Sequence, residues 1–274
     1  MTAAVVAEEL VETRIGKIEV RRGGSGKPIV YLHSAAGEGA GLAFLDELAS
    51  TRELFAPMFP GFGLSEGIEQ IDDMEDAVFH LLDLFDRLGL RAPDVMGLSL
   101  GGWLAAELAT RYPDRLSKLI LANPAGLYIE GAPIKDIFGR SPKEMAQDLF
   151  ADMSHPAAQM MLRINDEMSN VAALGQAIPF ELLKPQLQSM AATARVGWNP
   201  YLHNPKLRKR LARITAPTLV IRGEKDTLIP APHCETYARE IPGAKLVEMS
   251  GVAHMVSMEQ PKELAALVNE FLGS

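Results

Sequence analysis

The segment 97–101, which reads Gly-Leu-Ser-Leu-Gly, is the feature that most constrains what this chain can fold into. The residues before it, 94–96, predict the end of a short buried strand, and residues 102–109 predict a helix. A serine on so sharp a strand-to-helix turn has its hydroxyl pushed out of the backbone, where a base can reach it. The glycines matter because the strand and the helix crowd the turn, where a Cβ would clash. The segment therefore predicts a nucleophilic Ser99.

Two loops further along the chain carry an acid and a histidine. Residues 217–221 form an apolar, β-branched run that predicts a buried parallel strand, and Asp226 lies in the loop that follows it. Residues 245–249 predict a shorter strand, which is followed by a loop that carries His254. Serine, then acid, then histidine is the chain order of the triad in one fold of serine hydrolases, and it differs from the order in two other folds.

With these residues in this order, the chain resembles the α/β-hydrolase superfamily over nearly its whole length. Residues 32–37 resemble the oxyanion loop of that superfamily, and residues 60–65 resemble its P-G-x-G-x-S turn. The superfamily often has glycine after the loop histidine, whereas this chain has Ser34. The resemblance implies an α/β-hydrolase fold, with a mostly parallel twisted sheet, helices on both faces of the sheet and an inserted helical cap.

The pattern along the chain agrees with one α/β core that is interrupted by an insertion. Strand-like and helix-like segments alternate in residues 1–127 and 209–274. Residues 128–208 contain no strand-like run, and residues 141–144 (Ser-Pro-Lys-Glu) form a capping box with proline at the first helical position. Because ligands of open α/β sheets bind at the carboxyl ends of the strands, residues 128–208 are predicted to form a helical cap over the site. Two further helices are predicted there, at 156–174 and 180–193.

The chemistry of serine assigns the catalytic roles. Free serine is a poor nucleophile and needs a base within hydrogen-bond reach, which His254 is predicted to provide for Ser99. Asp226 is predicted to orient His254 and to stabilise its imidazolium form. Glu224, two residues earlier, is the alternative acid.

The oxyanion hole of such a site consists of backbone N–H groups. The resemblance implies that Leu100, the residue after the nucleophile, donates one hydrogen bond and that Ala35 donates the other. Ala36 and Ser34 remain alternatives to Ala35. The Ser34 hydroxyl is expected either to donate a further hydrogen bond to the substrate or to brace the loop.

The predicted cap is rich in methionine, a flexible side chain that fills irregular apolar space. Most of these methionines are expected between helices, and a minority is expected to line an adaptable apolar pocket. Trp103 lies one helical turn after Ser99, and Trp198 lies near the end of the cap. The residues predicted to contact the substrate are Ser34, Trp103, Met145, Met160, Met161, Trp198 and Met255.

Composition narrows the classes of partner. The 274 residues carry a net charge of −8, and an acidic balance argues against nucleic acid and anionic membranes. No group of His, Cys, Asp and Glu has metal-ligand spacing and no dinucleotide or P-loop motif occurs, so neither a metal nor a cofactor is expected. The single cysteine, Cys234, excludes an internal disulfide. Without a membrane-length apolar run or a basic leader, the chain is expected to be cytoplasmic and to act on a small molecule, as a monomer or a homodimer.

The leading hypothesis is a cofactor-free carboxylesterase that cleaves small apolar esters or lactones through an acyl-enzyme. The first alternative is carbon–carbon bond hydrolysis, as in the meta-cleavage-product hydrolases, which share the core, the cap and the triad. Those enzymes commonly carry G-N-S-M-G-G at the turn and tryptophan after the catalytic histidine, where this chain has G-L-S-L-G-G and Met255. The second alternative is a small-ligand receptor built on a hydrolase, which an intact triad does not distinguish from an enzyme.

Overall fold

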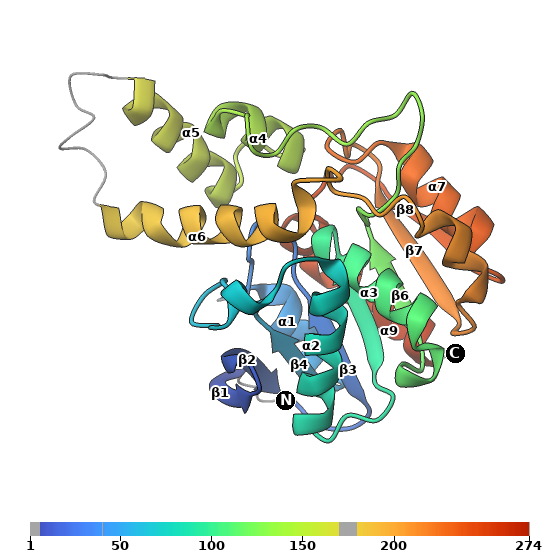
Figure 1. Cartoon of the computed structure of the whole chain (residues 1–274). Coiled ribbons are helices and arrows are strands. Elements are labelled where there is room, and N and C mark those ends of the chain that lie inside the picture. The colour runs from blue at the N-terminus through green and yellow to red at the C-terminus, as the bar shows by residue number, and fades with distance from the viewer. Residues whose placement is uncertain (1–5, 40, 170–179, 274) are drawn as a thin grey trace.

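The computed structural model describes residues 6–39, 41–169 and 180–273, whose strands form one twisted sheet (Figure 1). The strands are β1 (Ala7–Thr13), β2 (Gly16–Gly23), β3 (Pro28–Leu32), β4 (Glu53–Pro57), β5 (Asp94–Leu98), β6 (Leu119–Ala122), β7 (Thr218–Gly223) and β8 (Lys245–Met249). Their order in the sheet is β1-β2-β4-β3-β5-β6-β7-β8. The β1–β2 and β2–β4 pairs are antiparallel and the other neighbouring pairs are parallel, which confirms the predicted α/β class.

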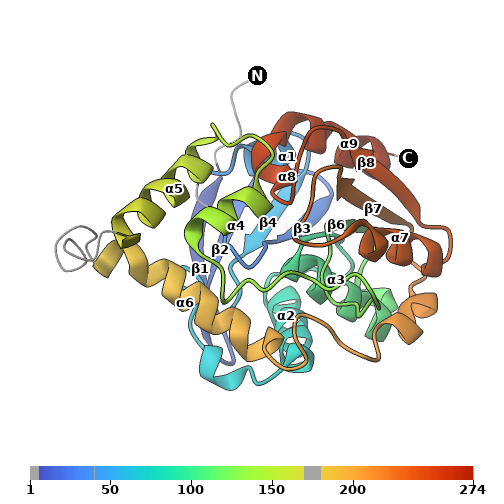
Figure 2. The same cartoon turned by 90° about the horizontal axis from the view of Figure 1, so that it is seen from above.

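Helices cover both faces of this sheet (Figure 2). One face carries α1 (Ala43–Ala49), α8 (Val256–Glu259) and α9 (Pro261–Gly273). The other face carries α2 (Met74–Arg87), α3 (Leu100–Arg111) and α7 (Ala231–Glu240). Because both faces are covered, the central strands are buried at consecutive rather than alternate residues, and every residue of β5 and β6 is buried.

Helix α2 shows how local sequence starts a helix and directs its apolar face toward the core. Its N-cap residue, Asp73, accepts hydrogen bonds from the N–H groups of Glu75 and Asp76, at 2.7 and 3.0 Å. These bonds satisfy two of the donors that a helix start leaves without an intrahelical partner. Apolar residues with helical spacing, among them Val78 and Phe85, face the sheet and are fully buried.

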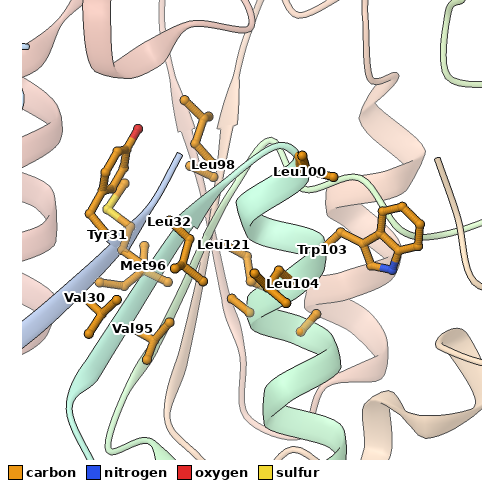
Figure 3. Close-up of a cluster of buried hydrophobic side chains, with 14 of the residues drawn as sticks. Val30, Tyr31, Leu32, Val95, Met96, Leu98, Leu100, Trp103, Leu104 and Leu121 are labelled. Carbon is orange, nitrogen blue, oxygen red and sulfur yellow. The ribbon is translucent and has the colours of Figure 1, made fainter. Parts of the chain in front are cut away.

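A cluster of buried side chains from β3, β5, β6 and α3 surrounds the strand-to-helix turn (Figure 3). Each of these side chains contributes about 1.5–3 kcal/mol when it leaves water, so the turn is seated on a rigid support. The labelled members are Val30, Tyr31, Leu32, Val95, Met96, Leu98, Leu100, Trp103, Leu104 and Leu121.

Three helices occupy the described part of the predicted cap segment, between β6 and β7: α4 (Pro142–Leu149), α5 (Pro156–Ser169) and α6 (Phe180–Gly197). The capping box is present, since the Ser141 hydroxyl accepts from the Glu144 N–H and the Glu144 carboxylate accepts from the Ser141 N–H. The predicted end of the second helix, at 174, lies outside the described residues, and α6 runs to Gly197 instead of ending at 193. Figure 1 shows these helices beyond the carboxyl ends of the strands. The domain boundaries at 128 and 208 stay a prediction.

Polar contacts hold this segment to the core at several points, of which two lie on opposite sides of the strand ends. On α6, the Arg195 guanidinium donates to the Ile71 carbonyl at 2.9 Å and to the Asp72 carboxylate at 2.9 Å. In the connection between α4 and α5, the N–H groups of residues 151 and 152 donate to one carboxylate oxygen of Glu259, at 2.8 and 3.0 Å. The segment is therefore fixed on both sides of the strand ends.

Among the described helices, none combines the length and the apolar character that crossing a bilayer requires. The cytoplasmic location stays a prediction.

Candidate active site

Ser99 adopts an unusual backbone conformation, with φ 56° and ψ −111°. A non-glycine residue in this region is strained and persists only when its surroundings hold it there. Three hydrogen bonds do so: the Ser99 N–H donates to the Ala122 carbonyl at 2.9 Å, and the Ser99 carbonyl accepts from Trp103 and Ala125 at 3.0 and 3.1 Å. The hydroxyl does not cap α3, so it stays available for chemistry at the carboxyl end of β5.

The glycines around Ser99 are required by close backbone approach. A Cβ on Gly97 would lie 2.2 Å from the Gly101 carbonyl oxygen, and a Cβ on Gly101 would lie 2.1 Å from the Leu32 carbonyl oxygen. A Cβ on Gly102 would lie 2.9 Å from the Pro124 Cβ. The backbone can therefore pack this closely around Ser99 only with glycine at 97 and 101.

Replacing Gly101 by alanine is expected to lower the free energy of unfolding by about 3 kcal/mol, because a backbone carbonyl has to move away from the new methyl group. For a chain of this size, that loss lowers the melting temperature by about 6–12 °C. Gly273→Ala is the matched control, since a Cβ on this exposed glycine meets nothing within 4 Å. Differential scanning calorimetry of the two variants tests the packing of the turn, and equal melting temperatures would contradict it.

His254 and Asp226 meet in a buried pair. His254 Nδ1 lies 2.8 Å from Asp226 Oδ2, and both side chains are buried. The other carboxylate oxygen, Oδ1, accepts from the N–H groups of Leu228 and Ile229, at 2.9 and 3.0 Å. A carboxylate only accepts hydrogen bonds, so Nδ1 carries the ring proton and Nε2 is left as the basic nitrogen. The pair has the geometry that a triad needs between its acid and its base.

Glu224, the alternative acid, points elsewhere. Its Oε2 accepts from the Gly251 N–H at 2.7 Å, and the residue lies at the surface. This contact supports the start of the histidine loop but does not reach the imidazole. The geometry favours Asp226 over Glu224 as the partner of His254.

Within residues 34–37 of the loop after β3, one backbone N–H lacks an acceptor among the described residues. The Ser34 N–H donates to Glu38 Oε1 at 2.9 Å, the Ala36 N–H to the Ser34 hydroxyl at 3.0 Å, and the Gly37 N–H to the Ser34 carbonyl at 3.1 Å. Only the Ala35 N–H in residues 34–37 has no acceptor within the described part of the chain. Of the three alternatives for the second oxyanion donor, the geometry favours Ala35.

The Leu100 N–H is the second free donor. It belongs to the first residue of α3, where no earlier helical carbonyl exists to accept it, and it has no acceptor within the described residues. The start of a helix carries partial positive charge, which favours a developing oxyanion. The Gly101 N–H donates to the His33 carbonyl at 3.1 Å and so ties α3 to the loop that carries Ala35.

His33 braces that loop as a neutral histidine. Its Nδ1 lies 2.6 Å from the Ser34 carbonyl oxygen, and its Nε2 lies 2.8 Å from the Phe59 nitrogen. A carbonyl accepts and an N–H donates, so Nδ1 carries the proton and Nε2 accepts. Burial lowers the pKa of His33, which keeps the ring uncharged. The histidine therefore links the loops after β3 and β4.

Asn123, at the end of β6, connects the acid and histidine loops and was not predicted as a site residue. Its side chain is fully buried, its Oδ1 accepts from the Gly223 N–H at 2.9 Å, and its Nδ2 donates to the His254 carbonyl at 2.9 Å. Its backbone has φ 39°, a conformation that asparagine tolerates well. The signal that could have found it is an Asn-Pro pair at the end of a strand that lies beside the acid-bearing strand.

Replacing Asn123 by aspartate is expected to lower kcat by about tenfold to a hundredfold, because small displacements of reacting groups have large effects on rate. The carboxylate still accepts from Gly223 but repels the carbonyl oxygens of Ala253 and His254 instead of donating to them. Asn269→Asp is the matched control, since Asn269 only accepts from Thr51 at the surface. Steady-state kinetics on both variants, with melting temperatures, test this role, and a kcat within twofold of wild type would refute it.

The residues predicted to contact the substrate fall into three groups. Trp103 and Met255 are buried, and the Trp103 indole N–H donates to the Glu107 carboxylate at 3.0 Å. Met145 and Met161 are half-buried against the core. Met160 and Trp198 are exposed by 54% and 63% of their surface, so the structure does not place them in an enclosed pocket.

The contacts of Ser34 and the surroundings of Trp198 bear on the predicted substrate pocket. The Ser34 hydroxyl donates to Glu38 Oε2 at 2.5 Å, so its single proton braces the loop instead of facing a substrate. Trp198 lines a cavity of about 350 Å³ whose other walls are Ile134, Asp136, Phe138 and Tyr201.

Within the described residues, no group of three or more His, Cys, Asp or Glu side chains is arranged to hold a metal ion.

Comparison with known proteins places this site in a family. The family model described as alpha/beta hydrolase fold matches residues 27–261, and the chain belongs to this family. The 2-hydroxymuconate semialdehyde hydrolase of Pseudomonas sp. (strain CF600) is 28% identical, over 97% of this chain and 94% of that protein. The 2-hydroxy-6-oxo-2,4-heptadienoate hydrolase of Pseudomonas putida is 27% identical, over 92% of this chain and 91% of that protein.

A solved structure shows the same fold. It is the 2-hydroxy-6-oxo-6-phenylhexa-2,4-dienoate hydrolase from Rhodococcus sp. strain RHA1, with a TM-score of 0.78 and 20% sequence identity. The match covers 99% of this chain and all of that one. The chain is a hydrolase of the α/β family.

Proposed function

We propose that this hydrolase cleaves a carbon–carbon bond in a small 2-hydroxy-6-oxo-2,4-dienoate. The observation that carries the proposal is the end-to-end similarity, at 27% and 28% identity, to two hydrolases that are named for such substrates. This proposal reverses the ranking drawn from the sequence, in which ester hydrolysis came first. It retains the predicted nucleophile, base and acid, whose roles remain part of the proposal.

Carbon–carbon cleavage requires a leaving group that can hold the bond electrons. When the dienol gains a proton at C5 and loses the hydroxyl proton at C2, C5 becomes saturated and C2 becomes a carbonyl. Ser99 then attacks the C6 carbonyl while His254 Nε2 takes the hydroxyl proton. As the C5–C6 bond breaks, its electrons pass through the C3–C4 double bond to the C2 oxygen, and the dienolate takes a proton from the His254 imidazolium.

The remaining acyl group stays on Ser99 until water releases it. His254 takes a proton from that water as its oxygen bonds to the acyl carbon, the bond from that carbon to Ser99 Oγ then breaks, and Ser99 Oγ takes the proton back from the His254 imidazolium as the acid product leaves. Both steps pass through a tetrahedral oxyanion, for which the free N–H groups of Ala35 and Leu100 are the proposed donors. Asp226 supports the imidazolium in each step through its 2.8 Å contact with His254.

Ester hydrolysis is the second candidate, and one sequence observation favours it. Leu98, Leu100 and Met255 stand where the meta-cleavage-product hydrolases commonly have asparagine, methionine and tryptophan. An alcohol is a better leaving group than a carbanion and needs no prior tautomerisation, so the same triad serves esters with fewer demands on the pocket. The two candidates share the acyl-enzyme and differ in the leaving group.

A parallel assay distinguishes the candidates. The wild-type protein is tested with 2-hydroxy-6-oxo-2,4-heptadienoate and 2-hydroxymuconate semialdehyde, followed by loss of the dienol absorbance, and with p-nitrophenyl esters of two to ten carbons. The expected result is a kcat/KM for one dienoate at least a hundredfold above that for the best ester. Ser99→Ala, prepared in the same way, controls for contaminating hydrolases, and Ser50→Ala, which alters an exposed serine, controls for the substitution itself.

Two outcomes would reject the proposal. Turnover of esters without turnover of either dienoate assigns the protein to the carboxylesterases. Saturable binding of a dienoate without turnover of any substrate favours a receptor built on this fold.

A further inference from the structure

Glu38 receives three hydrogen bonds in the loop after β3. Its Oε1 accepts from the Ser34 N–H at 2.9 Å and from the Tyr31 hydroxyl at 2.8 Å, and its Oε2 accepts from the Ser34 hydroxyl at 2.5 Å. Hydrogen bonds to an ionised carboxylate are shorter and stronger than neutral ones. Tyr31 lies in β3 and is almost fully buried, so Glu38 joins the loop to the sheet.

These contacts decide where the Ser34 hydroxyl points. A serine hydroxyl has one proton, which goes to Glu38, and its lone pairs are left to accept. The Ala36 N–H donates to one of them at 3.0 Å. The hydroxyl is thus a relay that lets Glu38 fix the N–H of residue 36 as well as the N–H of residue 34.

Residues 34–37 are left with a single backbone donor that has no acceptor among the described residues. With the N–H groups of Ser34, Ala36 and Gly37 all occupied, the Ala35 N–H remains. We propose that Glu38 is a positioning residue for the oxyanion hole, and that it acts through Ser34 to present the Ala35 N–H to the developing oxyanion. This inference rests on the proposed function, because it needs a tetrahedral intermediate on Ser99.

The arrangement accounts for the departure from the family pattern. Where the superfamily often has glycine, the Ser34 side chain brings a hydroxyl that would otherwise compete for the loop's N–H groups. The Glu38 carboxylate holds that hydroxyl in one orientation. The Ser34 Oγ also lies 4.0 Å from the sulfur of Met255, so the fixed loop borders the loop that carries His254. Preorganised donors contribute most to catalysis when they need not reorient during the reaction.

Glu38→Gln tests the inference without changing the size of the side chain. Glutamine offers one carbonyl oxygen and one NH2 group to three donors, so one donor loses its acceptor if the NH2 group takes the place of Oε2, and two lose it if the NH2 group takes the place of Oε1. Ser34→Ala removes the relay but keeps the carboxylate. Glu270→Gln is the matched control, since Glu270 is exposed on α9, away from the strand ends.

An alkyl fluorophosphonate is the probe, because its reaction does not depend on which substrate the protein turns over. Ser99 Oγ forms a bond to phosphorus, His254 takes the hydroxyl proton, and the P–F bond breaks with fluoride as the leaving group. The phosphoryl oxygen gains negative charge in the transition state and needs the same N–H donors. The rate of labelling is measured against probe concentration, which separates the binding constant KI from the rate constant kinact.

For Glu38→Gln, kinact is expected to fall by about tenfold to thirtyfold while KI stays within twofold, and Glu270→Gln is expected to match wild type. Ser34→Ala is expected to lower kinact comparably, and the double variant to fall little further than either, because both residues act through one path. If the two residues only stabilise the fold, the melting temperature falls, but kinact does not fall selectively relative to KI, and the double variant shows no non-additivity.

The outcomes separate the inference from the proposed function. Labelling of wild type with an unchanged kinact in Glu38→Gln overturns the inference alone, as do multiplicative effects in the double variant. If Glu38→Gln does not fold, the kinact of Ser34→Ala decides in its place, and a value within twofold of wild type overturns the inference. A wild-type chain that is not labelled at Ser99 overturns the proposed function, and the inference with it.

Discussion

Replacing Ser99 by alanine is expected to lower kcat by about 10⁴-fold or more, for dienoate and ester substrates alike, because catalysis then rests on the oxyanion hole and on binding alone. Ser99 is the residue at the strained strand-to-helix turn, with φ 56°. The variant keeps the strained backbone and loses one oxygen atom. Because the Ser99 hydroxyl does not cap α3, that loss removes no helix cap. Its melting temperature is therefore expected to stay within about 2 °C of wild type.

The measurement combines kinetics with mass spectrometry. Steady-state rates are compared for wild type, Ser99→Ala and Ser50→Ala, and peptide mapping locates the fluorophosphonate adduct. The adduct is expected on Ser99 in wild type and nowhere in Ser99→Ala. Residual activity within tenfold of wild type, in a preparation free of contaminating hydrolase, would remove Ser99 from the mechanism.

Asp226→Asn is expected to lower kcat by about 10⁴-fold, because the amide leaves the histidine in the wrong tautomer. The N–H groups of Leu228 and Ile229 hold an acceptor at the Oδ1 position, so the NH2 group of asparagine turns toward His254. Facing a donor, Nδ1 becomes the acceptor and the proton moves to Nε2. Nε2, the nitrogen that is proposed to take the Ser99 proton, then cannot act as a base.

Glu224→Gln is the matched control for this experiment. The amide oxygen of glutamine still accepts from the Gly251 N–H, so the kcat is expected to stay within about threefold of wild type. Rates are measured under conditions in which chemistry limits turnover. A severe loss of kcat in Glu224→Gln together with a mild loss in Asp226→Asn would assign the role of the acid to Glu224.

Much of the fold was predictable from local signals. The sharp turn at 97–101 was recognisable from five consecutive residues, although one of its glycines is required by the approach of Leu32, and the capping box at Ser141 closes within one helical turn. Buried strands such as β6 are recognised because their residues are apolar throughout. Such signals do not depend on the rest of the chain, and the structure confirms them.

The substrate contacts were predicted least well. Met160 and Trp198 were assigned to the pocket by residue type and position in the segment, whereas both are largely exposed. Helical periodicity says which residues share a face, but not which face meets the core. That choice depends on how α4, α5 and α6 pack on one another and on the strand ends.

The sequence by itself determined the α/β class, the chain order of Ser99, Asp226 and His254, and the insertion of helices after β6, because these follow from short-range patterns and from the order of segments. The tertiary structure decided which acid meets the histidine and which loop N–H stays free. It alone brought Asn123 to Gly223, 100 residues away, and Glu38 to the Ser34 hydroxyl. Those choices depend on distances between loop atoms, and single hydrogen bonds of about 3 Å leave no trace in the periodicity of a sequence.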